Sequence, residues 1–381
     1  MKALKSGKLR AGLALRCRSV RALAGAAVVV LTVAGGITGC TPEASDASLA
    51  EGGASEAGGG EGNGELPLYV TGGGPMGSEA TNGYLPGVNQ PVPETPQPHK
   101  AAYDGTVEVI VDEQGNEYEI TSVKVAPPKE GMGTGKLIRI GVPYNYPGIG
   151  LMDEETGIPS GLDVDIAAYI AWKLGYSPYD IEWVAAPAPA RVPLLQSGRV
   201  DMMVAPMTIT PERAEQVDFA GPYLVAGQDI LVRSNETSIE SPQDLNGKSV
   251  CLLLNTTAEK RIREMLSDDT EIIYGDSYVD CMEKIVDGEI DATSTDDIIL
   301  AGHASTDEFF RLVKLVGKPF SQEYFGIGLP KGSHNMCLQV NSALSEMFED
   351  GSWEKFISRN VIGTNYFPDR YDNPPALNKC A

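Results

Sequence analysis

Histidine and basic residues are scarce in this sequence. Only three of its 381 residues are histidines, His99, His303 and His334. None of them form the HxH or HxxxH spacing with which histidines bind transition metals, so we expect no metal and no cofactor. Lys and Arg number 30 against 52 for Asp and Glu, which gives a net charge of -22. Binding to nucleic acid requires the opposite sign and is excluded.

The length allows two compact domains and an extension, since a typical domain has roughly 150 residues. Hydrophobic residues make up 42% of the chain, which is enough for a sizeable core. The 43 glycines and 26 prolines indicate that other segments are unstructured.

The N-terminal segment has the pattern of a secretion signal. Residues 1–21 carry seven basic residues and no acidic one, and residues 22–39 carry no charge. The motif Ile37-Thr38-Gly39-Cys40 resembles the lipobox of bacterial lipoproteins, in which cleavage leaves the cysteine as a lipid-modified N-terminus. The alternative is an uncleaved transmembrane helix, because eighteen uncharged residues nearly span a bilayer. We expect cleavage after residue 39 and a lipid anchor at Cys40, and both interpretations place the remainder outside the cell.

The region between residues 40 and 135 divides into two parts. Residues 40–100 are dominated by Gly, Pro, Glu and Ser and have almost no apolar periodicity, so we expect a disordered tether. Residues 101–135 contain an accessory hairpin or linker, with strands at 106–111 and 118–120 around a turn at 113–116. Such a hairpin is too small to be stable alone.

From residue 136 onward, strand-like and helix-like segments alternate, which favours an α/β fold with parallel sheets covered by helices. The series repeats, so we expect two lobes, with residues 136–231 plus 325–381 in the first and 232–324 in the second. The strand-like runs 228–233 and 324–329 are candidates for the crossovers. Open α/β sheets bind ligands beyond the carboxyl ends of their strands.

Arg213 is the first candidate for a ligand-binding residue. It follows Thr210-Pro211-Glu212, a helix start with an N-cap Thr and Pro at the first helical position. A cation in the first turn opposes the helix dipole by about 0.3 to 1 kcal/mol, so another interaction must favour it there. A guanidinium at this position is suited to clamp a carboxylate. The alternative is a solvated surface arginine. Thr208 would add a hydroxyl.

Two further candidates lie in the second lobe. Thr256, with Glu259 three residues later, matches a capping box, and the free backbone N–H groups there would also suit an anion. Asp296 follows a strand and precedes a helix, so it is either a helix cap or a counter-charge for an ammonium group. A cation on one lobe and an anion on the other complement a zwitterion, and the sequence therefore predicts a site for a free amino acid.

Four cysteines, Cys251, Cys281, Cys337 and Cys380, lie in the exported part of the chain. In an oxidising compartment they are expected to form two disulfides, and their spacing leaves all three connectivities open.

About 240 residues, from Lys136 to the C-terminus, resemble a known family. The segments IRIGVPYNYPG, SGLDVDIAAYIAWKLGY, GRVDMMVAPMTITPERAEQVDFAGPYL, DLNGKSVCLLLNTT, IDATSTDD and FGIGLPKGS are similar to those of extracellular solute-binding proteins of polar amino acid ABC transporters, which have the type II periplasmic-binding fold. Through VDFAGPYLVAGQDILV, STDDIILAG and EDGSWEKF the chain most resembles glutamate-binding lipoproteins of Gram-positive bacteria.

The resemblance implies roles for individual residues. Arg213 and Thr208 would hold the ligand carboxylate, and Asp296 the ammonium group. Thr256 and Thr257 would assist with the carboxylate and Tyr146 would cover the ligand. The resemblance also implies that Cys251 pairs with Cys281 and that Cys337 pairs with Cys380.

The sequence departs from the family pattern at four positions. Pro143 stands where some binders of acidic ligands carry a basic residue, Ala188 where many relatives have an aromatic, and Asn255 where Gly is usual. Pro206 stands where small residues are common, although its carbonyl can still accept from an ammonium group. A glutamate side chain needs a second cation, for which Arg191 is the first candidate and Lys260 the second. The alternative for Arg191 is pairing within its own lobe.

These observations predict a lipid-anchored receptor on the outer face of the membrane. It would be a monomer that closes around glutamate or a related polar amino acid by a hinge motion, presents it to an ABC permease, and catalyses nothing. One alternative is an enzyme on the same fold that resembles the dehydratases of aromatic amino acid synthesis. Another is the sensing subunit of a receptor, which would need a partner protein because no output segment follows Ala381.

Overall fold

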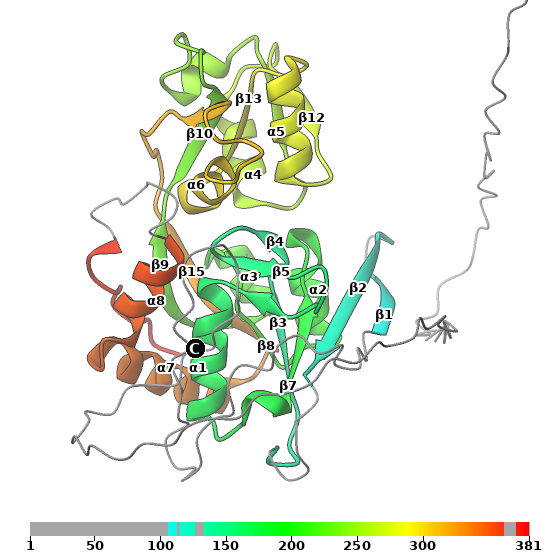
Figure 1. Ribbon diagram of the computed structural model, residues 1–381, viewed down its shortest axis with the longest axis vertical. Coiled ribbons are helices and arrows are strands. Elements are labelled where there is room, and N and C mark those ends of the chain that lie inside the picture. Colours follow the sequence, from blue (N-terminus) through cyan, green and yellow to red (C-terminus); the bar gives the residue numbers. More distant parts are fainter. Residues whose placement is uncertain (1–105, 113–114, 126–132, 362–370, 381) are drawn as a thin grey trace, which may run out of the picture. The chain divides into compact units, whose positions relative to one another are not determined.

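The computed structural model describes residues 106–112, 115–125, 133–361 and 371–380 (Figure 1). The expected signal segment, the lipid attachment site at Cys40 and the expected tether lie outside the described residues. Within the described residues, no helix is both long and apolar enough to cross a bilayer.

The strands form two large mixed sheets and one small sheet. The first large sheet has the order β1-β2-β7-β3-β8-β15-β9, with β1 Thr106–Val111, β2 Glu117–Lys124, β7 Ile181–Ala185, β3 Ile138–Val142, β8 Met202–Met203, β15 Glu323–Leu329 and β9 Asp218–Ala226. The second has the order β12-β11-β13-β10-β14, with β12 Glu271–Tyr274, β11 Ser249–Leu252, β13 Ala292–Asp296, β10 Gln228–Arg233 and β14 Val313–Leu315. The small sheet contains β4 Asn145–Tyr146, β5 Gly150–Met152 and β6 Pro159–Ser160.

Each large sheet has its own helices (Figure 1). The first lobe comprises the seven-stranded sheet with α1 Leu162–Lys173, α2 Arg191–Gln196, α3 Pro211–Gln216, α7 His334–Glu349 and α8 Ser352–Val361. The second lobe comprises the five-stranded sheet with α4 Thr257–Met265, α5 Tyr278–Asp287 and α6 Asp297–Ala304. The two-lobed α/β organisation expected from the sequence is thus the one observed. The expected boundaries are wrong by a few residues, because β10 begins at Gln228 in the second lobe and β15 begins at Glu323 in the first.

The sheets are parallel only in part. β3 pairs in parallel with β7 and β8, and β11 pairs in parallel with β12 and β13. The strands next to the crossovers are antiparallel to their neighbours: β15 to β9 in the first sheet, and β10 to β13 and β14 in the second. A strand that arrives from the other lobe runs antiparallel to its neighbours in the sheet. The alternation of strands and helices in the sequence does not reveal this direction. The chain crosses between the lobes at Gly227 and again between residues 316 and 322.

The expected hairpin is an extension of the first sheet. β1 pairs antiparallel with β2, and β2 pairs antiparallel with β7. The guanidinium of Arg199 donates to Glu108 of β1 and to Glu182 of β7, each at 2.8 Å, and also to Ser122 of β2 at 3.0 Å. Pairing with the sheet and this charged cluster supply the stability that an isolated hairpin would lack.

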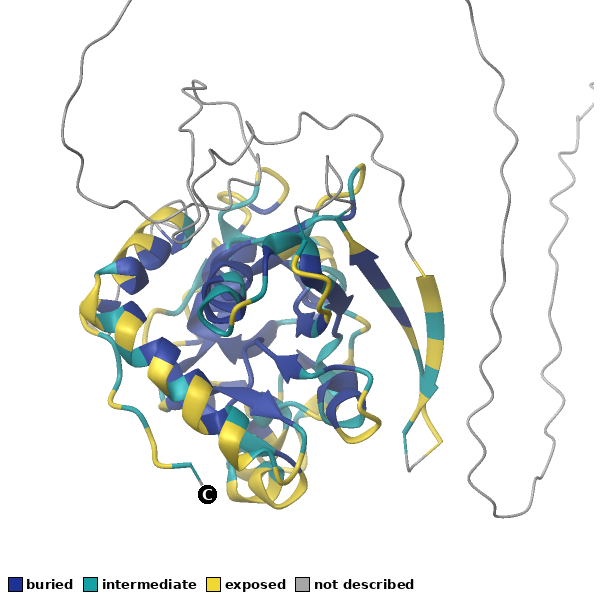
Figure 2. Cartoon of the chain, turned by 90° about the horizontal axis from the view of Figure 1, so that it is seen from below, coloured by how far each residue is buried: buried dark blue, intermediate teal, exposed yellow. Residues whose placement is uncertain are grey.

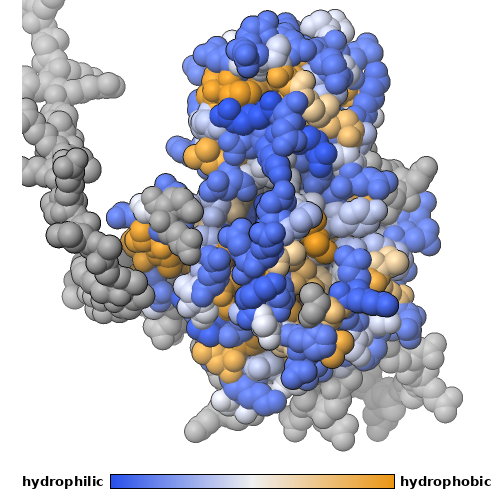
Figure 3. All heavy atoms as spheres, turned by 180° about the vertical axis from the view of Figure 1, so that it is seen from behind, coloured by the Kyte–Doolittle hydropathy of each residue, from blue (hydrophilic) through white to orange (hydrophobic). Residues whose placement is uncertain are grey.

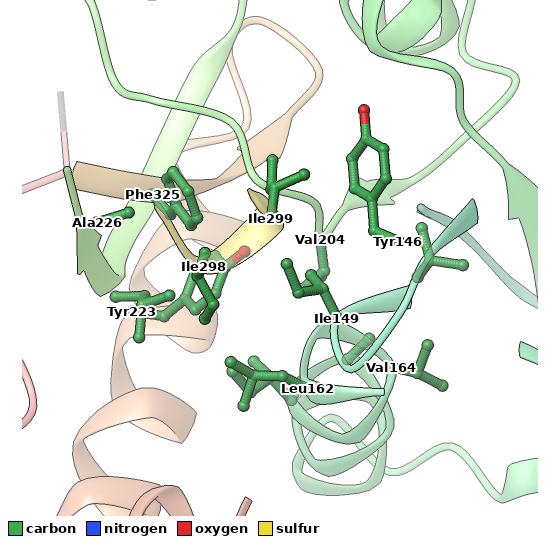
Figure 4. Close-up of a cluster of buried hydrophobic side chains, with 14 of the residues drawn as sticks. Tyr146, Ile149, Leu162, Val164, Val204, Tyr223, Ala226, Ile298, Ile299 and Phe325 are labelled. Carbon is green, nitrogen blue, oxygen red and sulfur yellow. The ribbon is translucent and has the colours of Figure 1, made fainter. Parts of the chain in front are cut away.

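Buried residues line the strands and the inward faces of the helices (Figure 2). The largest apolar cluster combines residues of both lobes, among them Ile149, Leu162 and Phe325 of the first and Ile298 and Ile299 of the second. Figure 4 shows these side chains together. The lobes therefore share apolar contacts as well as two crossover segments.

Two disulfides join helices to other elements. Cys251 of β11 is bonded to Cys281 of α5 with their Cα atoms 5.6 Å apart, and Cys337 of α7 is bonded to Cys380 with a Cα separation of 5.9 Å. Both separations are ordinary for disulfides. These are the pairs that the family resemblance implies.

The outer surface is largely hydrophilic on the face shown in Figure 3. Exposed large hydrophobic residues do occur, and three of them, Val107, Val109 and Val111, share one face of the edge strand β1. Exposed apolar residues of this kind are normal on protein surfaces.

Candidate functional site

The segment from Ala205 to Thr208, which follows β8, supplies backbone acceptors to Arg191 of α2 and Arg213 of α3. The carbonyl of Pro206 accepts a hydrogen bond from Arg191, and the carbonyl of Thr208 accepts one from Arg213. Thr208 itself bridges to Phe325 of β15, which ties this segment to the adjacent crossover strand. One short stretch of backbone at the end of a strand thus orients two guanidinium groups.

Arg191 is the first residue of α2 and is only 5% exposed. Its Nη1 donates to the carbonyl of Pro206 at 2.5 Å, while its buried Nε has no hydrogen-bond partner in the part of the chain that the structure describes. Among the described residues no carboxylate forms an ion pair with Arg191, but its hydrogen bond to Pro206 is a pairing within its own lobe. A buried guanidinium with an unused donor is suited to bind an anionic ligand group.

Arg213 belongs to α3 and is half-buried. Its Nη1 donates to the carbonyl of Thr208 at 2.9 Å and its Nη2 to the carbonyl of Asn255, in the second lobe, at 3.5 Å. Burial, and next the neighbouring charge of Arg191, lower the pKa of Arg213 to about 10. The positive charge of Arg191 beside Arg213 forms an electropositive site that a carboxylate would neutralise.

Thr210 begins α3 as the sequence predicts. Its hydroxyl accepts from the backbone N–H of Arg213 at 3.2 Å, and Pro211 occupies the first helical position. The cap fixes where the helix starts and therefore where Arg213 lies.

Asp296 is the last residue of β13 and precedes α6. It occupies the N-cap position but makes no side-chain capping hydrogen bond, so the capping interpretation is wrong. The residue is 6% exposed, and no described residue forms a hydrogen bond with its Oδ1. Burial, followed by the charges of Glu323 and Asp297, raises the pKa of Asp296 well above its ordinary range. The positive charges of Arg191 and Arg213 oppose this shift, which places Asp296 within electrostatic reach of both.

Glu323 is a second buried carboxylate close to Asp296, and the sequence did not indicate it. It is fully buried at the start of β15, where it accepts from Arg261 of α4 at 2.8 Å and from Ser321 at 2.7 Å. Its Oε2 has no hydrogen-bond partner. The only sequence signal for it is a charged residue at the head of an apolar strand.

Three aromatic rings meet at the site. Tyr146 of β4 is 4% exposed, and its ring centroid lies 6.0 Å from those of Tyr278 of α5 and His303 of α6. Burial raises the pKa of Tyr146 and lowers that of His303 to about 4, so both are neutral at neutral pH. Figure 4 shows the Tyr146 hydroxyl directed away from the aliphatic side chains. Tyr278 and His303 were not predicted, since each occupies an ordinary position within a helix.

Helix α4 begins with an N-cap that differs from a standard capping box. The hydroxyl of Thr256 accepts from the N–H of Glu259 at 3.1 Å, as in a capping box, but the Glu259 carboxylate accepts from the N–H of Asn255 and not from that of Thr256. Asn255 has a left-handed backbone with φ of 60°. Thr256 and Thr257 are half-exposed.

The described residues contain no cluster of His, Cys, Asp or Glu that could hold a metal ion. What the two lobes do bring together is a pair of guanidiniums, a buried carboxylate without a hydrogen-bonded cation, and three neutral aromatic rings. This arrangement defines a two-lobed α/β binding protein for a small dipolar solute.

Comparison with known proteins places the chain within a family. Residues 138–362 match the model of bacterial extracellular solute-binding proteins, family 3. The chain belongs to this family.

Individual relatives are similar over the same region. The glutamate-binding protein GluB of Corynebacterium efficiens is 36% identical over 232 residues, which cover 59% of this chain and 78% of the relative. The solved structure of an ancestral arginine-binding protein bound to arginine is 35% identical with a TM-score of 0.55, and the match covers 59% of this chain and 97% of that one. An ancestral amino acid-binding protein described as a precursor of cyclohexadienyl dehydratase is 31% identical with a TM-score of 0.53, covering 59% and 95%.

Proposed function

We propose that this protein captures a free amino acid outside the cell and delivers it to an ABC permease. The observation that carries the proposal is the coupling of Asp296 on one lobe with Arg191 and Arg213 on the other, all at least half-buried. Arg213, with Thr208, would take the α-carboxylate and Asp296 the ammonium group. A ligand that lacked either charge would leave the other partner buried and unpaired.

Glutamate, or a closely related polar amino acid, is the proposed ligand. Arg191 is the cation proposed to bind the side-chain carboxylate, because its buried Nε is unused among the described residues and it lies beside Tyr146. The similarity to the glutamate-binding protein GluB supports this choice. Tyr146, Tyr278 and His303 would enclose the aliphatic part of the ligand and exclude water, which strengthens the charge pairs.

The mechanism we propose is hinge closure at the two crossover segments. A ligand that contacts both lobes binds the closed form better than the open one and shifts the population toward it. Residues 1–39 would direct export and Cys40 would attach the mature chain to the membrane as a monomer. Thr256 and Thr257 would help hold the carboxylate at the start of α4.

Titration calorimetry with a panel of amino acids tests the proposal. Saturable binding of glutamate with no chemical change in the ligand supports it, and a lack of heat across the panel would refute it. The similarity to the precursor of cyclohexadienyl dehydratase makes an enzyme the second candidate. Conversion of arogenate or prephenate, followed by ultraviolet absorbance, would favour that alternative.

A further inference from the structure

A buried tyrosine beneath the site lies within hydrogen-bond distance of two acceptors. The Oη of Tyr223, on β9, is 2.8 Å from Oδ1 of Asp163 and 2.9 Å from the carbonyl oxygen of Ala205. A tyrosine hydroxyl has one hydrogen and can donate to only one of them. If Asp163 is ionised, one of the two contacts therefore brings two oxygen atoms together with no hydrogen between them, which is repulsive.

A proton on Asp163 resolves this conflict. The carboxylic acid then donates to Tyr223, and Tyr223 donates to Ala205, so each short contact contains one hydrogen. Both residues are at most 1% exposed, and Oδ2 of Asp163 has no hydrogen-bond partner among the described residues. An isolated buried carboxylate is costly, whereas a neutral acid that donates a hydrogen bond is well accommodated.

The charged and titratable groups that act on Asp163 come from two other elements, Tyr223 of β9 and Arg191 of α2. Burial raises the pKa of Asp163 to about 7, although the hydrogen bond from Tyr223 and the charge of Arg191 each lower it. Asp163 also lies in the first turn of α1, where the helix dipole favours an anion. Burial outweighs these three effects.

The position of this hydrogen-bonded chain connects it to the ligand site. Ala205 begins the segment whose next carbonyls, those of Pro206 and Thr208, orient Arg191 and Arg213. Tyr223 is the donor described for the Ala205 carbonyl. Loss of the proton would withdraw the Tyr223 hydrogen toward Asp163 and leave Ala205 without this donor. It would also create a buried anion that attracts Arg191.

We propose that Asp163 is a positioning residue that carries a proton in the binding-competent protein, and that the chain Asp163, Tyr223, Ala205 holds the segment that orients both arginines. The proposal rests on the amino acid-binding function proposed above. The new element is Asp163, which does not contact the ligand but whose proton would affect ligand affinity.

The test compares the wild type with Asp163→Asn, whose side-chain amide donates to Tyr223 at every pH. Dissociation constants for L-glutamate are measured between about pH 6 and about pH 8.5, where the charges of free glutamate change little. Titration of Asp296 affects the dissociation constants of both proteins equally. The ratio of the two constants therefore isolates the effect of Asp163 ionisation. We expect the wild type to weaken relative to Asp163→Asn by about fivefold or more across this range, because the competent fraction falls as Asp163 ionises.

Asp165→Asn provides a matched control. Asp165 is a buried carboxylate on the same helix, but it bonds to Arg359 and Asn360 of α8. Its removal is expected to leave the pH profile of glutamate binding like that of the wild type. Tyr223→Phe, which removes the donor to Ala205, is expected to weaken binding about tenfold and to abolish the contribution of Asp163 to the pH profile.

A second measurement needs no ligand. The native state holds a proton that the unfolded chain releases above pH 4, so the wild type loses stability relative to Asp163→Asn as the pH rises from about 4 to about 7, and the gap is constant above that. A gap that does not change with pH would overturn the proposal. Identical pH profiles of binding in wild type and Asp163→Asn would overturn it while leaving the amino acid-binding function intact. A wild type that binds none of the panel would overturn both.

Discussion

The ammonium of Lys260 on α4 lies 2.8 Å from the carboxylate of Glu212 on α3, so an ion pair joins the two lobes beside the ligand site. Both side chains are about 60% exposed, at 61% and 62%. Lys260 therefore already has an anionic partner at the surface, whereas the guanidinium of Arg191 is buried with an unused donor. Of the two cations considered for a ligand side chain, the structure favours Arg191.

This difference predicts how selectivity responds to mutation. Arg191→Met is expected to reduce glutamate affinity on the order of a hundredfold and to reduce the preference for glutamate over glutamine, because the side-chain carboxylate loses its cation. Lys260→Met is expected to leave that preference unchanged. Calorimetry with both amino acids measures the ratio, and an unchanged ratio in Arg191→Met would contradict the assigned role.

Arg213→Ala is expected to abolish binding of every amino acid while leaving the fold intact. The α-carboxylate is common to all of these ligands, and loss of its clamp is expected to cost at least on the order of a hundredfold in affinity. Folding should not suffer, because removal of Arg213 also removes a repulsion with Arg191. Arg139→Ala serves as a control, since Arg139 pairs with Asp201 in the same lobe at 2.8 Å. Affinity and melting temperature are measured for both, and wild-type affinity in Arg213→Ala would rule out the clamp.

Helix starts and strand positions could be predicted from this sequence because they depend on local chemistry. Thr210 and Thr256 both accept the hydrogen bonds that their N-cap patterns indicate. The alternating pattern also predicted most strands and helices between residues 137 and 305, whereas the short strands β4 to β6, strand β9 and the C-terminal helices α7 and α8 were not predicted. The antiparallel pairing near the crossovers did not, since it depends on which sheet each strand joins.

Some site residues could likewise be predicted from local sequence, and others could not. Arg213 and Asp296 could be proposed because each follows a strand and carries an unexplained charge. Tyr278, His303 and Glu323 carry no such signal, and they approach Tyr146 or Asp296 only through tertiary packing. Asp163 illustrates the limit most clearly, because an acidic residue in the first turn of a helix has an ordinary local explanation. Its importance depends on Tyr223, 60 residues away in the sequence.

We expect the carboxyl group of Asp296 to release a proton when the ligand binds. Burial, followed by the charges of Glu323 and Asp297, raises the pKa of Asp296 in the ligand-free site and so favours its protonated form, whereas pairing with an ammonium group favours the ionised form. Affinity for the zwitterion is therefore expected to rise with pH until Asp296 is ionised without ligand. Calorimetry in buffers with different ionisation enthalpies counts the released proton. Asp296→Asn should bind on the order of a hundredfold more weakly and release no proton from this position. An equal proton release in the variant would assign it to another group.

A contact of Gly302 with the other lobe allows lobe closure to be tested by mutation. This residue lies in α6 of the second lobe, and a Cβ atom built on it would come within 2.3 Å of the carbonyl oxygen of Pro147 in the first lobe. The clash is with backbone, which cannot move aside as a flexible side chain can. Gly302→Ala is therefore expected to force the lobes apart and to weaken ligand affinity by about tenfold or more, because the closed form becomes less populated.

The ligand-free variant should be at least as stable as the wild type, since Ala is favoured over Gly within a helix by roughly 0.5 to 1 kcal/mol. Small-angle scattering with and without glutamate reports on closure. A wild type that compacts on adding glutamate, together with a Gly302→Ala variant that compacts less, would show that this contact belongs to the closed form. Equal compaction and equal affinity would mean that the Gly302 contact with Pro147 relaxes without moving either lobe, and that closure does not depend on it.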